Sequence, residues 1–166
     1  MHSKTEFEKQ LKAWLEGFLE RKFSTTHKIQ VLIPDSNLSK LQIPAIKSID
    51  GYWFYEFKPD VLGILEDKRS DKVDFVFINR SISALSLKEI GELYCYSKLA
   101  KPLFAFITSP LGLASDVVLL LLHKEVENSV LSFEDSKVIT IFKWNIDTNN
   151  IDKETIYPLE KANIFD

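Results

Sequence analysis

Two apolar segments joined by a short polar turn constrain the fold of this chain more than any other feature of its sequence. Residues 57–65 and 73–79 both carry runs of apolar side chains at successive positions, without the alternation typical of a sheet that faces water. Strands of this kind are covered on both faces, usually by helices. The polar residues 67–71 predict the turn between them. The sequence therefore predicts a hairpin of two buried strands inside an α/β protein.

Helical patterns lie on both sides of this hairpin. Apolar residues at helical spacing predict a first helix over residues 4–22, opened by a capping box from Ser3 to Glu6. A second capping box, from Ser86 to Glu89, predicts a helix that ends near Ala100. The remaining elements are expected to be a helix over 114–126 and strands over 29–33, 43–49, 52–57, 103–108 and 138–144, with Asp50-Gly51 as a hairpin turn.

The order of these elements predicts an α/β fold with a mixed central sheet and helices on both faces. The helix between strands 73–79 and 103–108 is a crossover, so these two strands should be parallel with a right-handed connection. At 166 residues the chain is expected to form a single domain. Its core is expected over about 4–144, and the polar tail 145–166 is expected to be peripheral.

Composition excludes several classes of protein. The longest apolar run, 117–122, is far shorter than the ~20 residues needed to span a bilayer, so no membrane partner is expected. The first residues lack the apolar core of a signal peptide. With Cys95 as its only cysteine, the chain forms no intrachain disulfide and no cysteine-based zinc site. These features favour a cytoplasmic protein.

The charge is distributed unevenly along the chain. The net charge of −3 argues against a generic basic DNA-binding protein. Residues 1–110 carry 16 basic and 14 acidic side chains, a net charge of +2, whereas residues 111–166 carry 5 basic and 10 acidic side chains, a net charge of −5. A solvated surface of mixed charge explains this better than a nucleic-acid footprint.

The predicted hairpin pairs an acidic residue of its first strand, Asp60, with a polar residue of its second strand. Folding it about the middle of its turn places Asp60 across from Asn79, and directly paired residues point to the same face of a sheet. An acid opposite a second acid, with a lysine two residues further on, would form a magnesium-dependent nuclease site. Here the acid faces an amide, and the residue two positions on is Ser81.

This pattern resembles the restriction-endonuclease-like, or PD-(D/E)XK, nuclease superfamily, whose core is αβββαβ. The resemblance covers roughly residues 4–110. It implies two carboxylates that hold Mg²⁺ or Mn²⁺, a metal-activated water, and a lysine that stabilises negative charge in the transition state. The segments that carry the resemblance are Lys58-Pro59-Asp60, residues 77–81, and the helix 88–100, where Glu92 and Tyr96 take the places of a Q-x-x-x-Y motif.

Two of the three core positions depart from the superfamily pattern. Asp60 takes the place of the aspartate. Asn79 takes the place of the second acid without its charge, and Ser81 takes the place of the lysine. The resemblance therefore implies a protein with a decayed catalytic centre, which acts in DNA binding or as part of a DNA-processing assembly.

An active enzyme is the first alternative. In some nucleases of this fold the second acid lies on the following helix, and Lys88, Glu92 and Tyr96 share one helix face here. If that face looks toward Asp60, then Asp60 and Glu92 would bind Mg²⁺ or Mn²⁺ and Lys88 would replace the missing lysine. An ordinary exposed pair of Lys88 and Glu92 is the competing explanation.

A protein-interaction module that binds no nucleic acid is the second alternative, favoured by the slightly acidic charge. A homodimer is compatible with all three hypotheses. The literal E-x-K motif, residues 66–68, is expected to be a charged turn, since it lies ~20 Å along the strand from Asp60. The side chains expected in or near the core include Trp14, Trp53, Trp144 and Cys95.

Overall fold

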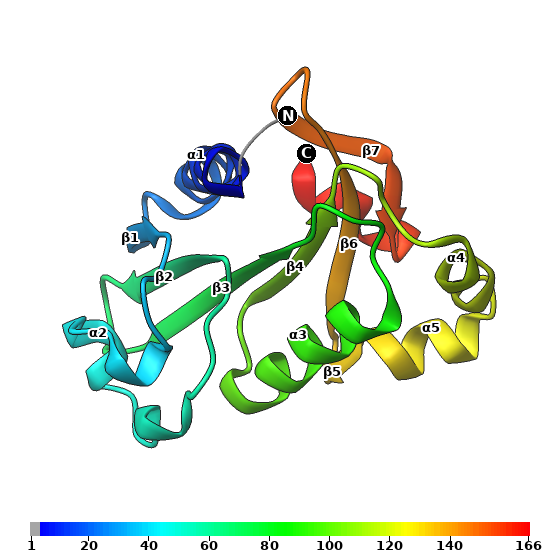
Figure 1. Cartoon of the computed structure of the whole chain (residues 1–166). Helices are drawn as coiled ribbons and strands as arrows, with labels where there is room; N and C mark the ends of the chain where they lie inside the picture. Colours follow the sequence, from blue (N-terminus) through cyan, green and yellow to red (C-terminus); the bar gives the residue numbers. More distant parts are fainter. Residues whose placement is uncertain (1–3) are drawn as a thin grey trace. The chain divides into compact units, whose positions relative to one another are not determined.

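A computed structural model describes residues 4–166 of the chain (Figure 1). The fold is mixed α/β, as predicted, with a seven-stranded sheet whose hydrogen-bonded neighbours follow the order β1-β2-β3-β4-β6-β5, while β7 pairs with β6. The chain divides into two compact units, one up to Phe77 and one from Ile78 onward. The boundary falls inside strand β3 (Val73–Arg80), which therefore contributes to both units.

The first unit is built around helix α1 (Lys4–Phe23) and strands β1 (His27–Leu32) and β2 (Val61–Asp67). Strand β1 runs antiparallel to β2, and α1 packs on both of them. The first helix is therefore confirmed, while the capping residue Ser3 lies outside the described residues. The helix buries an apolar stripe that consists of Phe7, Leu11, Leu15, Phe18 and Leu19.

The two strands predicted over 43–49 and 52–57 are wrong. Pro44 opens a short helix, α2 (Pro44–Lys47), because its fixed φ suits the first position of a helix. Gly51, at a φ of 82°, leads into the 3-10 helix η2 (Tyr52–Phe54). The carbonyls of residues 55 and 57 accept backbone hydrogen bonds near η1 (Leu38–Lys40), which replace the expected strand pairing.

The strand predicted from residue 57 begins only at Val61, so residues 57–60 form its approach. Tyr55, just before this approach, and Phe57, at its start, turn toward the sheet. The ring of Tyr55 lies 6.1 Å from that of Phe75, and the ring of Phe57 lies 5.7 Å from that of Phe77. These aromatic contacts hold the segment that leads into β2 against strand β3 within the first unit.

The second unit contains two parallel strands, β4 (Phe104–Ser109) and β6 (Lys137–Asn145). Helix α3 (Leu87–Ala100) begins at the predicted capping box, in which the Ser86 hydroxyl accepts the N–H of Lys88 and the Glu89 carboxylate accepts the N–H of Ser86. The single helix predicted over 114–126 is wrong in extent, because two helices, α4 (Ser115–Leu121) and α5 (Lys124–Leu131), take its place.

The C-terminal residues belong to the core of the second unit, so the peripheral tail expected at 145–166 is wrong. Strand β7 (Asn150–Tyr157) pairs antiparallel with β6, and the 3-10 helix η3 (Leu159–Phe165) follows it. Phe165 is buried, with its ring 5.5 Å from that of Phe106 and 5.7 Å from that of Phe142. The short strand β5 (Ser132–Glu134) completes this unit beside β6.

Candidate functional site

The predicted site residues are divided between the two units. Asp60 belongs to the first unit, where it lies half-buried in a bend directly before β2 and between the buried residues Pro59 and Val61. The other candidates, Asn79, Ser81, Lys88 and Glu92, belong to the second unit. The pairing of Asp60 with Asn79, and a metal site shared by Asp60 and Glu92, therefore stay predictions.

Asn79 is the second-to-last residue of β3, and its side chain is half-buried. Its Oδ1 is shielded from solvent and has no hydrogen-bond partner within the described part of the chain. A shielded amide oxygen is a neutral acceptor, which carries a partial charge but not the full charge of a carboxylate. At the position where the resemblance predicts a second acid, Asn79 therefore offers one neutral oxygen and no full negative charge.

Ser81 follows β3 directly, and hydrogen bonds fix both its backbone and its side chain. Its N–H donates to the carbonyl of Thr108 over 3.0 Å. Its Oγ accepts the backbone N–H of Ser83, also over 3.0 Å, which closes a serine turn. The hydroxyl of Ser81 is therefore part of a turn and supplies no positive charge.

Lys88 and Glu92 both lie on the exposed side of α3, whose buried residues are Ile90, Leu93 and Ser97. The hydroxyl of Tyr96 donates to Oε1 of Glu92 over 2.5 Å. The predicted shared face of Glu92 and Tyr96 is thus confirmed.

The oxygen atoms that Asn79 and Ser81 could offer to a metal ion do not fit a magnesium nuclease centre. One is a neutral amide oxygen, and the other is a hydroxyl that already accepts a hydrogen bond within its turn. Within residues 4–166, no three Asp, Glu, His or Cys side chains gather in an arrangement that would hold a metal ion. Neither Asn79 nor Ser81 therefore supplies the charge that the catalytic step of the superfamily requires.

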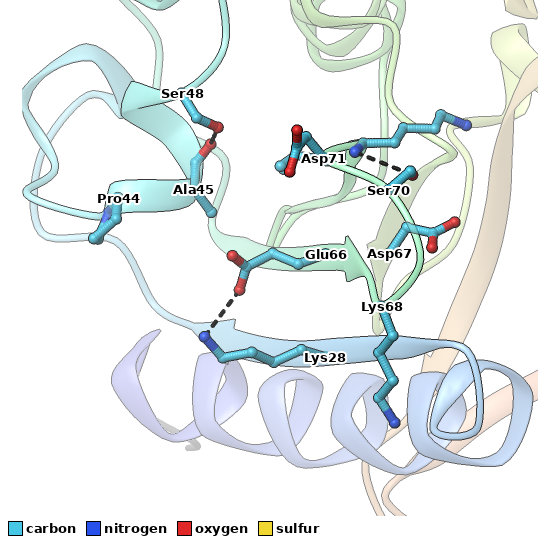
Figure 2. Close-up of a pocket in the computed structure, with 11 residues that line it drawn as sticks. Lys28, Pro44, Ala45, Ser48, Glu66, Asp67, Lys68, Ser70 and Asp71 are labelled. Atoms are coloured by element: carbon cyan, nitrogen blue, oxygen red, sulfur yellow. Dashed lines mark hydrogen bonds and ion pairs between the residues drawn. The ribbon is translucent and has the colours of Figure 1, made fainter.

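The literal E-x-K motif lies at the turn end of the hairpin, and the predicted turn is confirmed. Figure 2 shows these residues around a pocket of the first unit with a volume of about 740 Å³. Nζ of Lys28 lies 3.1 Å from Oε2 of Glu66, and Nζ of Lys68 donates to the carbonyl of Ser24. The backbone N–H of Arg69 is the main cause that lowers the pKa of the Asp67 carboxyl. These contacts hold the turn together.

The charges around this pocket are balanced. Its lining includes three lysines and three carboxylates, and Lys72 forms a further ion pair of 3.0 Å with Asp74. A pocket with equal numbers of both signs does not select an anionic ligand over a cationic one. The balance supports a structural role for the turn. The charged side chains in the lining are Lys28, Lys68, Lys72, Glu66, Asp67 and Asp71.

Several side chains are exposed that the sequence pattern predicted to be in or near the core, or for which it predicted nothing. Trp53 and Phe54, both in η2, are 54% and 68% exposed, so the expectation that Trp53 lies in or near the core is wrong. Cys95 is exposed as well, contrary to the expectation of a buried thiol. Trp144 is buried and Trp14 is half-buried, as expected.

Comparison with models of known protein families and with curated protein sequences finds no match to this chain. Among the described helices, none is long and apolar enough to cross a membrane. The order of the elements and the mixed sheet define the class of this protein, a mixed α/β protein. The membership of a nuclease superfamily stays a prediction.

Proposed function

We propose that this chain is a restriction-endonuclease-like protein that binds DNA without cleaving it, as part of a DNA-processing assembly. The observation that carries the proposal is the hydroxyl of Ser81, which accepts the N–H of Ser83 at the position where the resemblance requires a lysine. Asn79 adds a neutral amide where it requires an acid. Without the acid a hard divalent cation is held weakly, and without the lysine the negative transition state is stabilised less.

The charge distribution does not by itself indicate DNA binding, but it favours residues 1–110 for the proposed DNA contacts. Residues 1–110, which carry the resemblance, have a net charge of +2, although the whole chain has −3. Contacts between lysine or arginine and phosphate release counterions, so the affinity should fall as salt rises. A cytoplasmic location belongs to the same proposal, because a single free cysteine, Cys95, fits a reducing compartment.

Binding and cleavage assays on the same DNA test the proposal. Labelled single-stranded, duplex and branched DNA are titrated with the protein between about 50 and 200 mM salt, and the anisotropy of the label is measured. The same substrates are incubated with Mg²⁺ or Mn²⁺ and resolved on denaturing gels. We expect salt-dependent binding and intact DNA. Cleavage that disappears in Asp60→Ala would overturn the non-catalytic part, and an absence of binding to every substrate would overturn the DNA-binding part.

A further inference from the structure

Helix α4 of the second unit is apolar on its outer face as well as on its inner face. Every residue from 117 to 122 is apolar. Val117 and Leu121 are buried, whereas Leu119 and Leu122 are 65% and 68% exposed. The outer face of a surface helix is normally polar, so exposed leucines at this spacing indicate a face that binds another molecule. Figure 1 shows α4 at the margin of this unit, next to α5.

The apolar face continues into two hollows on the surface of the same unit. The larger, of about 700 Å³, is lined by apolar residues that include Ala84, Val118 and Leu119. The smaller, of about 260 Å³, is lined by Leu111 among others. Leu113 and Val118 line both hollows, which makes the surface continuous. We call it the α4 surface, and define it as the hollow-lining residues Ala84, Leu111, Leu113, Val118 and Leu119 together with the exposed Leu122 at the end of α4.

Hydrogen bonds between two loops hold the α4 surface in place. The N–H of Leu85 donates to the carbonyl of Gly112 over 2.8 Å, and the N–H of Ala114 donates to the carbonyl of Leu85 over 2.9 Å. The Ser109 hydroxyl donates to the carbonyl of Ser83 over 2.6 Å. A surface that is already ordered loses little conformational entropy when a partner binds.

The charges on this part of the chain decide which partner fits. Residues 111–166 have a net charge of −5. Asp116 on α4 and Glu125 on α5 are exposed, whereas the two charges in the lining of the smaller hollow, Glu154 and Lys143, balance each other. Lys124 is bound at 2.7 Å by two carboxylates, Glu127 and Glu160, so its charge is outnumbered. Acidic surroundings favour a basic partner and repel the phosphates of nucleic acid.

The same charges disfavour a second copy of this chain as the occupant. In a twofold dimer the same patch meets itself, which would place the acidic surroundings of one copy against those of the other. Like charges brought together at an interface reduce affinity.

We propose that the α4 surface binds an amphipathic helix of a protein partner that carries leucine-like side chains on one face and lysine or arginine on the other. Helix-in-groove binding of this kind uses apolar anchors at i, i+3, i+4 and i+7. The inference goes beyond the proposed function and depends only on the surface of the second unit.

Designed peptides test the inference on the full chain. The probe is a labelled helix of about 18 residues made of leucine and lysine in a helical pattern. One control peptide has the same composition in scrambled order, and another has glutamate in place of lysine. We expect the patterned basic peptide to bind, and both controls to bind at least tenfold more weakly. Equal binding of the glutamate peptide, or an absence of binding by the patterned basic peptide, would overturn the inference.

Point variants show whether the peptide binds at the α4 surface. Leu119→Ser and Leu122→Ser each remove one exposed anchor and should weaken binding about tenfold, since a bound partner would bury that apolar side chain. Leu99→Ser is the matched control, because Leu99 is 59% exposed on α3 and should leave the affinity unchanged. Equal losses in all three variants would overturn the inference. So would concentration-dependent dimerisation of the parent that Leu119→Ser abolishes.

Discussion

The hydroxyl of Ser81 accepts the backbone N–H of Ser83 over 3.0 Å. This bond gives the position a structural role in the turn that follows β3. Ser81→Ala should therefore lower the free energy of unfolding by about 1 kcal/mol, measured by urea denaturation. Ser83→Ala is the control, because the donor is the backbone of residue 83 and survives the change. Equal effects of the two substitutions would contradict the assignment.

Restoring the charges of the superfamily motif tests whether this centre is a decayed nuclease site. If the resemblance is right in placing Asn79 beside Asp60, the double variant Asn79→Asp, Ser81→Lys should bind Mn²⁺ more tightly than the parent, because the ion then has two carboxylates to bind. The measurement is the increase in Tm with added Mn²⁺. The double change is expected to lower stability without metal, since Oδ1 of Asn79 is shielded and the Ser81 turn is lost.

The matched control for this restoration is the triple variant that also carries Asp60→Ala. Its Tm should no longer rise with added Mn²⁺, while its stability without metal should stay lowered by the other two substitutions. A double variant that does not respond to Mn²⁺, or a triple variant that responds equally, would argue against the pairing of Asp60 with Asn79 and hence against the resemblance.

The exposed side of α3 separates the non-catalytic proposal from the migrated-site alternative. Because Lys88 and Glu92 are exposed, Lys88→Ala and Glu92→Gln should change the free energy of unfolding by less than about 0.5 kcal/mol. With either substitution, as with the parent, DNA incubated with Mg²⁺ or Mn²⁺ should stay intact. If the parent cleaves DNA and Glu92→Gln abolishes the cleavage, the active nuclease with Glu92 as its second acid is the correct description.

The capping box of α3 predicts a dependence of stability on pH. The Ser86 hydroxyl donates to Glu89 over 2.5 Å, and this bond is the main cause that lowers the pKa of the Glu89 carboxyl. A carboxyl with a lowered folded-state pKa stabilises the fold above its unfolded-state pKa and loses that contribution as pH falls through the folded value. Glu89→Ala should therefore cost about 1 kcal/mol at pH 7.

Urea denaturation across the acid range checks this dependence. The difference in stability between the parent and Glu89→Ala should shrink as the pH falls below 4.5, the ordinary pKa of a glutamate carboxyl. Glu92→Gln provides the comparison, since Glu92 lies on the exposed side of the same helix. A difference that stays constant as the pH falls to about 3 would show that the charge of Glu89 does not stabilise the cap.

Local signals in the sequence predicted the elements that local physics determines. The apolar stripe of α1 and the capping box at Ser86 each act within a few residues, and both predictions hold. The segment 43–57 was misassigned because aromatic residues favour strands in general, whereas Pro44 and Gly51 impose helical and left-handed conformations here. The break near His123, where α4 ends and α5 begins, carries no proline or glycine that would have predicted it.

The candidate site was less predictable because its geometry depends on contacts between distant residues. Of the aromatic residues 52–57, Tyr55 and Phe57 meet Phe75 and Phe77, while Trp53 is exposed to solvent. Nothing within the segment itself distinguishes the inward rings from the outward one. The Ser81 turn itself is local, but the N–H of Ser81 also donates to the carbonyl of Thr108, a distant residue that the sequence did not connect to it.

Gly63 allows helix α1 to approach strand β2 closely, and its substitution tests the packing of the first unit. A Cβ at this position would lie 2.9 Å from Cδ1 of Leu19 and 3.1 Å from Cβ of Val76. Both neighbours are fully buried, so neither has free space to move into. Gly63→Ala should therefore lower the free energy of unfolding by about 1–3 kcal/mol.

Gly91→Ala is the matched control for this substitution. Gly91 lies within α3, is exposed, and would bring its Cβ within 4 Å of no described neighbour outside the backbone of the helix. Alanine restricts the unfolded chain and favours a helix, so this variant should gain up to about 1 kcal/mol. Urea denaturation of both variants gives the comparison. If Gly63→Ala were as stable as the parent, α1 would not pack against β2 as closely as the Cβ distances require.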